Sequence, residues 1–308
     1  MIIMLKYKIV VCVFSLSFCS RYAHRDSKTT KAVFPLAYRK ILDMHTHTDN
    51  SFDGNHSTMY MCECAEHLGL RGLAFTDHVE IDIFHQDNFD RRALQSYFEI
   101  IKARAAFMGR LLIFVGVELG EATYDIPTAE QLLDSLHYDF VIGSIHNLRG
   151  EEDFCFLDVD NTSDAEIREI LNEYFEEERK LAEWGKVDTL AHLTYPLRYI
   201  CGEHDRNVDL RDYNSQIEAV LKAVIHSGIS LEINTSGLYQ KLQSTMPGEE
   251  IISWYRRLGG ELITIGSDSH YGERLGFGVS DGMALAERCG FRKLTIYQKR
   301  EPIQIPIE

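Results

Sequence analysis

The chain has 308 residues, of which 45% are hydrophobic, and this is enough apolar material for one large domain or two small ones. Its formal net charge is −15, so we expect neither nucleic acid nor an anionic membrane as a partner. A small anionic substrate would need a local source of positive charge, such as a metal ion. The seven cysteines are odd in number and contain no C-x-x-C pair, which indicates neither a disulfide framework nor a structural zinc knuckle.

Residues 1–37 differ in composition from the rest of the chain. A short apolar stretch from Ile9 to Cys19 follows two lysines and is followed by polar residues. This pattern resembles a weak signal peptide without a clean cleavage site, and the apolar stretch is too short to span a bilayer. We predict a leader outside the folded domain and a cytoplasmic protein. Export is the alternative if residues 1–20 act as a signal peptide.

From residue 39 onward, short apolar runs alternate with longer helical patterns. The predicted strands are 39–47, 72–79, 111–121, 139–148, 188–196, 229–237, 261–270 and 292–298. The predicted helices lie near 58–69, 91–109, 127–136, 164–185, 209–227, 247–258 and 280–289. Ser163 followed by Glu166 indicates a capping box, and five glycines stand where helices should end: Gly69, Gly109, Gly185, Gly228 and Gly259. Seven or eight β-α units predict a single α/β domain over 38–300, with a parallel barrel rather than an open sheet.

Histidines and carboxylates follow nearly every predicted strand. The groups that we expect to bind metal are His45, His47, Asp53, His78, Glu118, His146, His192, Asp268 and His270. In a barrel these strand ends meet on one face, where active sites of this architecture lie. Imidazole and carboxylate ligands without thiolate favour zinc, manganese or iron. Nine such groups exceed the needs of one ion, so we predict two or three divalent ions that share a bridging carboxylate.

The same residue types also have ordinary structural roles. A lone histidine at a strand end is more often a hydrogen-bonding residue than a ligand, and H-x-H alone is a weak signal. Six histidines and three carboxylates at the ends of six strands are hard to explain in that way. Other histidines are interpreted as helix or loop residues: His56, His67, His85, His137, His204 and His226. We expect Asp77 to orient a neighbouring ligand rather than to bind an ion.

Six motifs resemble the polymerase-and-histidinol-phosphatase (PHP) family, and most closely its monofunctional histidinol-phosphatase branch. They are "HTHTDNSFDG" (45–54), "TDH" (76–78), "GVELGE" (116–121), "GSIHNL" (143–148), "AHLTYPLR" (191–198) and "GSDSH" (266–270). The resemblance covers nearly all of 40–272 and implies a distorted (βα)7 TIM-like barrel with a trinuclear metal centre. The implied ligand sets are His45, His47, Glu118 and Asp268; then Glu118, His146 and His192; then Asp53, His78 and His270. Some relatives carry histidine at the position of Asp53, so this carboxylate leaves the identity of the third ion more open.

The resemblance further implies an activity, the hydrolysis of L-histidinol phosphate to L-histidinol and phosphate in histidine biosynthesis. A hydroxide that bridges two ions would attack phosphorus, with Glu118 and Asp268 among the catalytic groups. We expect Arg198, which follows the fifth strand, to neutralise the phosphoryl oxygens, unless it forms only a surface salt bridge. The leaving-group acid stays unassigned. Four acidic residues could receive the cationic part of the substrate: Glu80, Asp82, Asp87 and Glu121.

Three other functions stay open at this point. The chain could be a nucleotide phosphodiesterase, a protein-tyrosine phosphatase of the capsule-regulating type, or a catalytically silent PHP barrel that serves as a binding module. The acidic charge counts against a nuclease, and the intact ligand set counts against a silent barrel. We expect a small-molecule phosphate monoester as the partner, and the oligomeric state stays open.

Overall fold

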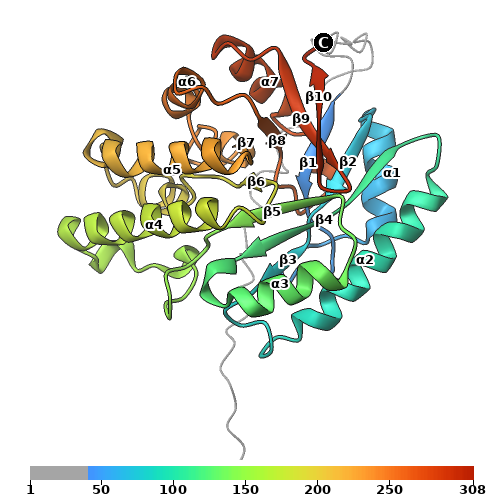
Figure 1. Ribbon diagram of the computed structural model, residues 1–308, viewed down its shortest axis with the longest axis horizontal. Helices are drawn as coiled ribbons and strands as arrows, with labels where there is room; N and C mark the ends of the chain where they lie inside the picture. The colour runs from blue at the N-terminus through green and yellow to red at the C-terminus, as the bar shows by residue number, and fades with distance from the viewer. Residues whose placement is uncertain (1–40) are drawn as a thin grey trace, which may run out of the picture. The chain divides into compact units, whose positions relative to one another are not determined.

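The computed structural model describes residues 41–308, and these form a parallel, nearly closed barrel (Figure 1). The strands of the main sheet are β1 Leu42–Thr46, β2 Gly72–Phe75, β3 His78–Glu80, β4 Leu112–Gly120, β5 Phe140–Ser144, β6 Thr189–Leu190, β7 Ser230–Asn234 and β8 Ile263–Gly266. Their order is β1-β2-β4-β5-β6-β7-β8, all pairs are parallel, and β3 pairs with β4 outside this path. The predicted seven-stranded barrel is therefore confirmed.

The barrel closes through a short contact between its first and last strands. The Asp268 amide donates to the His45 carbonyl at 2.8 Å, and the His47 amide donates to the Ser269 carbonyl at 2.9 Å. A single bridge joins Thr46 and Ser269, and it lies beyond the end of β8. Closure is thus made mainly at the carboxyl ends of β1 and β8, where it brings the predicted ligands of both strands together.

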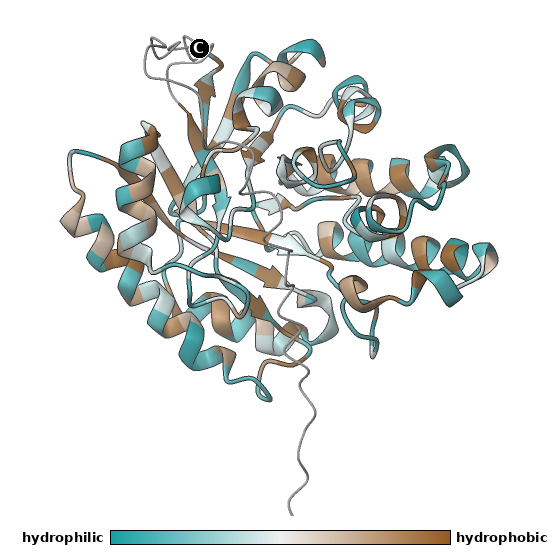
Figure 2. Ribbon diagram, turned by 180° about the vertical axis from the view of Figure 1, so that it is seen from behind, coloured by the Kyte–Doolittle hydropathy of each residue, from teal (hydrophilic) through white to brown (hydrophobic). Residues whose placement is uncertain are grey.

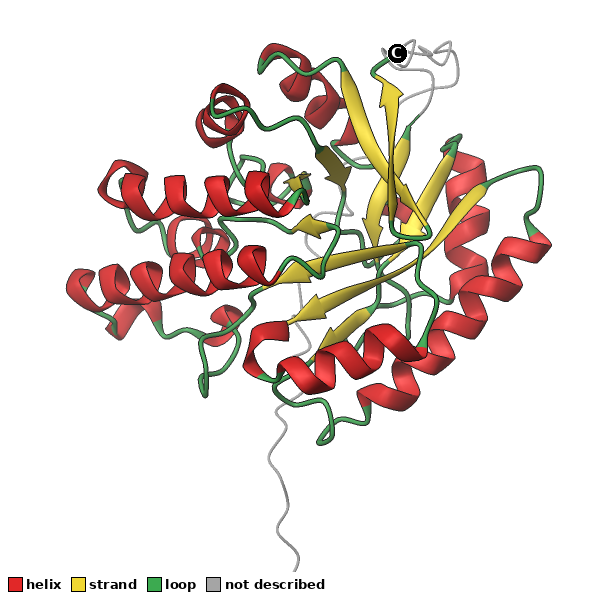
Figure 3. Ribbon diagram, viewed as in Figure 1, coloured by secondary structure: helices red, strands yellow, loops and turns green. Residues whose placement is uncertain are grey.

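Among residues 41–308 there are seven long helices. They lie outside the strands (Figure 3). They are α1 Thr58–Leu68, α2 Phe89–Ala106, α3 Ile126–Ser135, α4 Asp164–Trp184, α5 Asn214–Ser227, α6 Glu249–Arg257 and α7 Val279–Arg288. The short helices are η1 Ala122–Tyr124, η2 Phe154–Phe156, η3 Val159–Asn161, η4 Arg198–Glu203, η5 Leu210–Tyr213, η6 Ser236–Leu238 and η7 Gly272–Arg274. The long helices carry both hydrophilic and hydrophobic residues, as expected when one face packs on a core (Figure 2). Within residues 41–308, none of these helices has the length and apolar composition needed to cross a bilayer.

Local helix signals account for most helix boundaries. The predicted capping box is present, because the Ser163 side chain accepts from the Glu166 amide while the Glu166 carboxylate accepts from the Ser163 amide. Gly185 ends the same helix in a left-handed conformation that costs glycine little. The helix predicted over 209–227 begins five residues late, because the Asp209 side chain accepts from the Arg211 amide and starts a 3-10 turn.

The strands of the barrel are shorter than the predicted runs, and in two of the runs the difference changes where a site residue lies. The run 72–79 divides into β2 and β3, because Asp77 leaves the strand pattern and its carboxylate accepts from Thr48, Ser51 and Ser96. β3 nevertheless keeps the register that β2 has with β4. The run 188–196 contains only β6, so His192 lies in the segment that follows the strand.

The last predicted strand does not belong to the barrel. β9 Lys293–Gln298 pairs antiparallel with β10 Glu301–Pro306, a strand that the sequence pattern did not reveal. Tyr297 on β9 packs against Phe140, and its hydroxyl lies 2.8 Å from Ser230 Oγ at the start of β7. The hairpin thus covers the amino-terminal ends of the strands, opposite to the predicted site.

The barrel interior is apolar at the end that the hairpin covers. One cluster of buried side chains fills it: Leu42, Met44, Ala74, Phe114, Phe140, Ile142, Ala191, Ile296 and Tyr297. A larger apolar cluster lies between strands and helices. Packing on both faces holds the strands rigidly, and rigid strands fix the positions of the polar side chains at their carboxyl ends.

Glu178 on α4 is a buried acid whose two carboxylate oxygens lack a hydrogen-bond partner of good geometry among residues 41–308. Burial raises its pKa to about 8, although the neighbouring Tyr174 hydroxyl acts to lower it. The folded protein therefore holds a proton that the unfolded chain releases above its ordinary pKa of 4.5. The bound proton contributes to the free energy of unfolding. This contribution is fully present below pH 4.5 and falls by about 1.4 kcal/mol per pH unit as the pH rises toward the pKa of the folded state. We expect Glu178→Gln to raise the melting temperature at pH 8 and to change it little at pH 5, measured by thermal denaturation. An equal shift at both pH values would contradict this, and Glu183→Gln, at an exposed position, is the control.

Candidate metal centre

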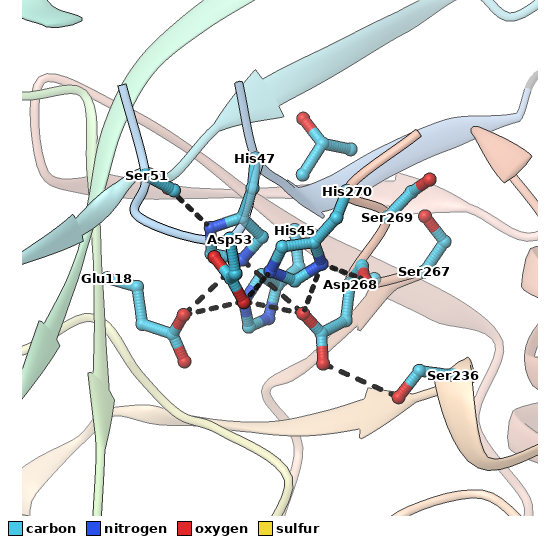
Figure 4. A network of polar contacts seen from close by, with 12 residues as sticks. His45, His47, Ser51, Asp53, Glu118, Ser236, Ser267, Asp268, Ser269 and His270 are labelled. Carbon is cyan, nitrogen blue, oxygen red and sulfur yellow. Dashed lines mark hydrogen bonds and ion pairs between the residues drawn. The ribbon is translucent and has the colours of Figure 1, made fainter. Parts of the chain in front are cut away.

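The nine side chains predicted as metal ligands lie together at the carboxyl ends of the strands. Figure 4 shows six of them: His45, His47, Asp53, Glu118, Asp268 and His270. Seven are buried: His45, His47, His78, Glu118, His146, His192 and Asp268. The His270 side chain is partly buried, and Asp53 is the most exposed of the nine, with 43% of its side chain accessible. The centre is therefore set into the barrel mouth and opens to solvent beside Asp53.

Glu118 on β4 occupies the middle of this cluster. Its Oε2 lies near three imidazole nitrogens: His45 Nε2 at 3.2 Å, His47 Nε2 at 3.4 Å and His78 Nδ1 at 3.2 Å. Its Oε1 lies near two others: His192 Nε2 at 3.0 Å and His146 Nε2 at 3.3 Å. The two oxygens thus face two separate groups of histidines, as a bridging carboxylate would.

Two further carboxylates complete the arrangement. Asp268 Oδ1 lies 3.4 Å from His47 Nε2 and 3.7 Å from His45 Nε2. Asp53 Oδ2 lies 2.9 Å from His270 Nε2, and its Oδ1 lies 3.8 Å from His78 Nε2. The members of each predicted ligand set are therefore neighbours. The His47 ring also stacks on the rings of His78 and His270, with centroids 4.4 and 4.2 Å apart, so the first and third sets adjoin.

The donor atoms fit metal ions better than they fit one another. Several buried nitrogens and oxygens have no hydrogen-bond partner among the described residues: His45 Nε2, His47 Nε2, His78 Nδ1, Glu118 Oε2, His192 Nδ1 and His270 Nε2. Such unsatisfied groups cost about 1–3 kcal/mol each. Two ligands of a tetrahedral zinc ion stand about 3.4 Å apart, since each bond is about 2.0–2.2 Å long. Most of the distances around Glu118 and Asp268 are near this value and longer than good hydrogen bonds.

The electrostatics of the cluster leave its ligands in different protonation states. Burial acts to lower the pKa of His45, His78, His146 and His270, but the neighbouring carboxylates raise it above its ordinary value, so these rings must lose a proton when they bind metal. Burial, together with the neighbouring His270 and His78, lowers the pKa of His47 to about 3, so its ring is neutral. Burial acts to raise the pKa of Glu118, but the facing histidines hold it well below its ordinary value, so its carboxylate is ionised. Neutral imidazole and ionised carboxylate are the forms that metals require.

A carboxylate that the sequence pattern did not single out supports this cluster from behind. Glu232 Oε1 on β7 lies 2.7 Å from His45 Nδ1, and its Oε2 accepts from the His192 amide at 2.9 Å. Gly266 leaves room for this contact, because a Cβ there would lie 2.2 Å from His45 Cβ. The sequence did contain a sign of this role, because Glu232 is an acidic residue inside an otherwise apolar predicted strand, two positions before Asn234.

Asp77 lies where an orienting residue would lie. Its Oδ1 accepts from the Ser51 hydroxyl at 2.9 Å and from the Thr48 amide at 2.6 Å. The Ser51 oxygen in turn lies 3.2 Å from His47 Nδ1, as Figure 4 shows. Asp77 therefore reaches His47 through Ser51, which fits the predicted orienting role.

Arg198 also lies at the centre rather than on the outer surface. Its Nη2 donates to Ser236 Oγ at 2.6 Å and to Asp268 Oδ2 at 3.1 Å. Its guanidinium lies over the Tyr195 ring, 5.0 Å from the ring centroid. Only 13% of the side chain is accessible. The predicted phosphate-binding residue is thus held beside the ligand Asp268.

The remaining predicted positions are divided between the centre and its surroundings. Glu80 and Glu121 are buried next to His146, whereas Asp82 is partly buried and accepts from Asn147. No contact joins Asp87 to the centre among the described side chains. The other histidines lie elsewhere: His67 and His226 in helices, His137 after α3, His85 exposed, His204 beside Asp160, and His56 accepting from the Gly272 amide at 3.0 Å.

The structure thus defines a parallel barrel whose carboxyl end carries a cluster of imidazole and carboxylate groups that could hold metal ions. The chain belongs to the PHP domain family, whose model matches residues 43–236.

Relatives with similar sequences extend over nearly the whole barrel. A "Probable histidinol-phosphatase" of Clostridium acetobutylicum is 28% identical over 263 residues, which cover 84% of this chain and 98% of that protein. A protein of the same name from Thermotoga maritima is 29% identical over 263 residues, and the match covers 97% of that protein. The "Histidinol-phosphatase" of Lactococcus lactis is 26% identical over 266 residues, which cover 94% of its length.

A solved structure shares the fold. It is the crystal structure of histidinol phosphate phosphatase from Lactococcus lactis complexed with zinc, L-histidinol and phosphate. The TM-score is 0.73 at 23% identity, and the match covers 86% of this chain and 99% of that chain. This likeness supports the barrel assignment made from strand order.

Proposed function

We propose that this protein is a metal-dependent phosphomonoesterase that hydrolyses L-histidinol phosphate to L-histidinol and phosphate, a step of histidine biosynthesis. The observation that carries the proposal is the joint placement of nine ligand-type side chains and Arg198 at one barrel mouth. Two further findings support it. The relatives named histidinol-phosphatase match over nearly their full length, and the structural neighbour was solved with L-histidinol and phosphate.

The proposed centre holds two or three divalent ions of zinc, manganese or iron. We assign His45, His47, Glu118 and Asp268 to the first ion, Glu118, His146 and His192 to the second, and Asp53, His78 and His270 to the third. When bound, the ions supply positive charge for the phosphoryl oxygens and lower the pKa of a water molecule toward neutrality. They also supply the local positive charge that an acidic chain needs for an anionic substrate.

The protein side chains orient the substrate. Arg198 presents a guanidinium beside Asp268, and its Nε has no hydrogen-bond partner in the described structure, so donors remain for the phosphate oxygens. Ser236 and the Tyr195 ring hold this guanidinium in place. Of the acidic residues near the mouth, Asp82 is better exposed than Glu80 or Glu121 and suits the cationic part of the substrate.

We further propose that the protein acts in the cytoplasm and does not bind nucleic acid. Two features support this. Cys62 and Cys289 are buried and form no disulfide within residues 41–308, as is usual in a reducing compartment. The net charge of −15 repels a polyanion.

A panel of substrates on the metal-loaded enzyme tests the proposed function. We expect kcat/KM for L-histidinol phosphate to exceed that for a generic aryl phosphate by roughly a hundredfold or more, because a site that pairs polar groups discriminates strongly against analogues that lack them. AMP, a dinucleotide and a phosphotyrosine peptide complete the panel. Faster turnover of any of these three would refute the substrate assignment but leave the metal centre intact. Growth of a histidine auxotroph that lacks this phosphatase provides the test in cells.

A further inference from the structure

A buried carboxylate, Glu80, lies between two histidines that we assign to different ions. Its Oε1 is 3.0 Å from His78 Nδ1, and its Oε2 is 3.4 Å from His146 Nδ1. Only 8% of the Glu80 side chain is accessible. This residue belongs to none of the three ligand sets, so its buried charge needs a different explanation.

The sheet places this carboxylate with little freedom. β3 pairs with β4 so that His78 stands beside Glu118 and Glu80 stands beside Gly120. The Glu80 side chain lies over Gly120, where a Cβ would be only 1.6 Å from Glu80 Oε2. Because His78 and Glu80 are two residues apart on one strand, their side chains share a face. Gly120 thus provides the space that lets Glu80 reach both rings.

The Nε2 atoms of the two rings lie beside other predicted ligands. His146 Nε2 lies 3.3 Å from Glu118 Oε1, within the second ligand set. His78 Nε2 lies 3.8 Å from Asp53 Oδ1, within the third. A neutral imidazole carries one N–H, so a carboxylate beside Nδ1 favours the proton there and leaves the Nε2 lone pair free for an ion. Glu80 Oε2 forms a hydrogen bond with His146 Nδ1, whereas Glu80 Oε1 acts on His78 Nδ1 by charge at 3.0 Å without hydrogen-bond geometry.

Neighbouring carboxylates do not replace Glu80 in this position. Glu121 Oε1 accepts from the His146 backbone amide at 2.6 Å, so it is engaged with the backbone rather than with the ring. Glu118 Oε2 is 3.2 Å from His78 Nδ1, but Glu80 Oε1 is nearer, at 3.0 Å.

We propose that Glu80 is a positioning residue that holds His78 and His146 in the tautomer that binds metal at Nε2, and so links the second and third ion sites. This inference rests on the proposed metal centre. In Glu80→Gln the amide can accept from one Nδ1–H, but its NH2 group faces the other. One of the two histidines must then change tautomer or rotate, while the first ion keeps its own ligands.

Metal binding and histidine tautomers test this role without reference to activity. We expect the wild-type protein to bind three zinc ions, measured by elemental analysis and chelator competition. In Glu80→Gln, the affinity for one of the two linked ions should fall about tenfold to a hundredfold, the usual cost of removing such a partner. Nitrogen NMR of the zinc-loaded wild type should show the proton of His78 and His146 on Nδ1. Glu177→Gln, a buried carboxylate on α4 that pairs with Lys180, is the matched control.

The possible results distinguish failure of the proposed role of Glu80 from failure of the proposed metal centre. Three ions in the wild type with unchanged affinities in Glu80→Gln would refute the role of Glu80 and leave the metal centre standing. A proton on Nε2 of either histidine in the wild type would refute it too, even if the variant fails to fold. A wild-type protein that binds no zinc would overturn both the centre and this inference.

Discussion

Glu118→Gln is expected to lower kcat by several orders of magnitude. The two carboxylate oxygens face five histidine nitrogens in two groups, and an amide can offer an oxygen to only one of these groups. The other group would meet an NH2, which cannot bind a metal ion. The loss of one preorganised electrostatic group already costs about a hundredfold or more, and here the shared ligand of two ions is lost. Steady-state kinetics on the metal-loaded variant measure the effect.

The metal content of the same variant should fall along with its activity. His67→Ala is the control, because this exposed histidine lies in the last turn of α1 and is not one of the clustered residues. It should keep its activity and its ions. Activity of Glu118→Gln within tenfold of the wild type would show that Glu118 does not bridge two ions.

Arg198→Ala is expected to lower kcat/KM by about a hundredfold or more, because a guanidinium that forms paired hydrogen bonds to phosphate is hard to replace. Its metal content should stay the same, since Arg198 contacts the Asp268 oxygen that faces away from His45 and His47. Kinetics and elemental analysis on one preparation separate the two effects.

Two further variants at arginine positions sharpen this test. Arg198→Lys should be more active than Arg198→Ala but less active than the wild type, because lysine keeps the positive charge but lacks the paired N–H donors of the guanidinium. Arg206→Ala is the control, because that guanidinium bonds the Val159 and Thr162 carbonyls and Asp164 instead of the centre. If Arg198→Ala loses metal as well as activity, the residue acts by holding Asp268, and its proposed contact with phosphate is wrong.

Much of the barrel could be predicted from local sequence patterns, because these patterns reflect interactions between residues that are close in the chain. Ser163 and Glu166 form a capping box that satisfies backbone amides at the start of α4, and Gly185 ends the same helix. Neither feature depends on the rest of the fold. The alternation of apolar runs with helical patterns likewise requires parallel strands, and parallel strands bring their carboxyl ends to one face. For that reason nine residues far apart in the chain could be expected in one cluster, and the structure places them there.

The sequence by itself therefore determined the order of the elements and the face that holds the polar side chains. Only the tertiary structure decided which strand is left out of the barrel, because the pairing of β9 with β10 depends on a neighbour and not on its own composition. It also decided the supports of the cluster. Glu80 and Glu232 reach histidines across the sheet, and glycines at 120 and 266 leave the room that they need. Such contacts join residues of different strands, and their distances depend on register and packing, which no single stretch of the chain encodes.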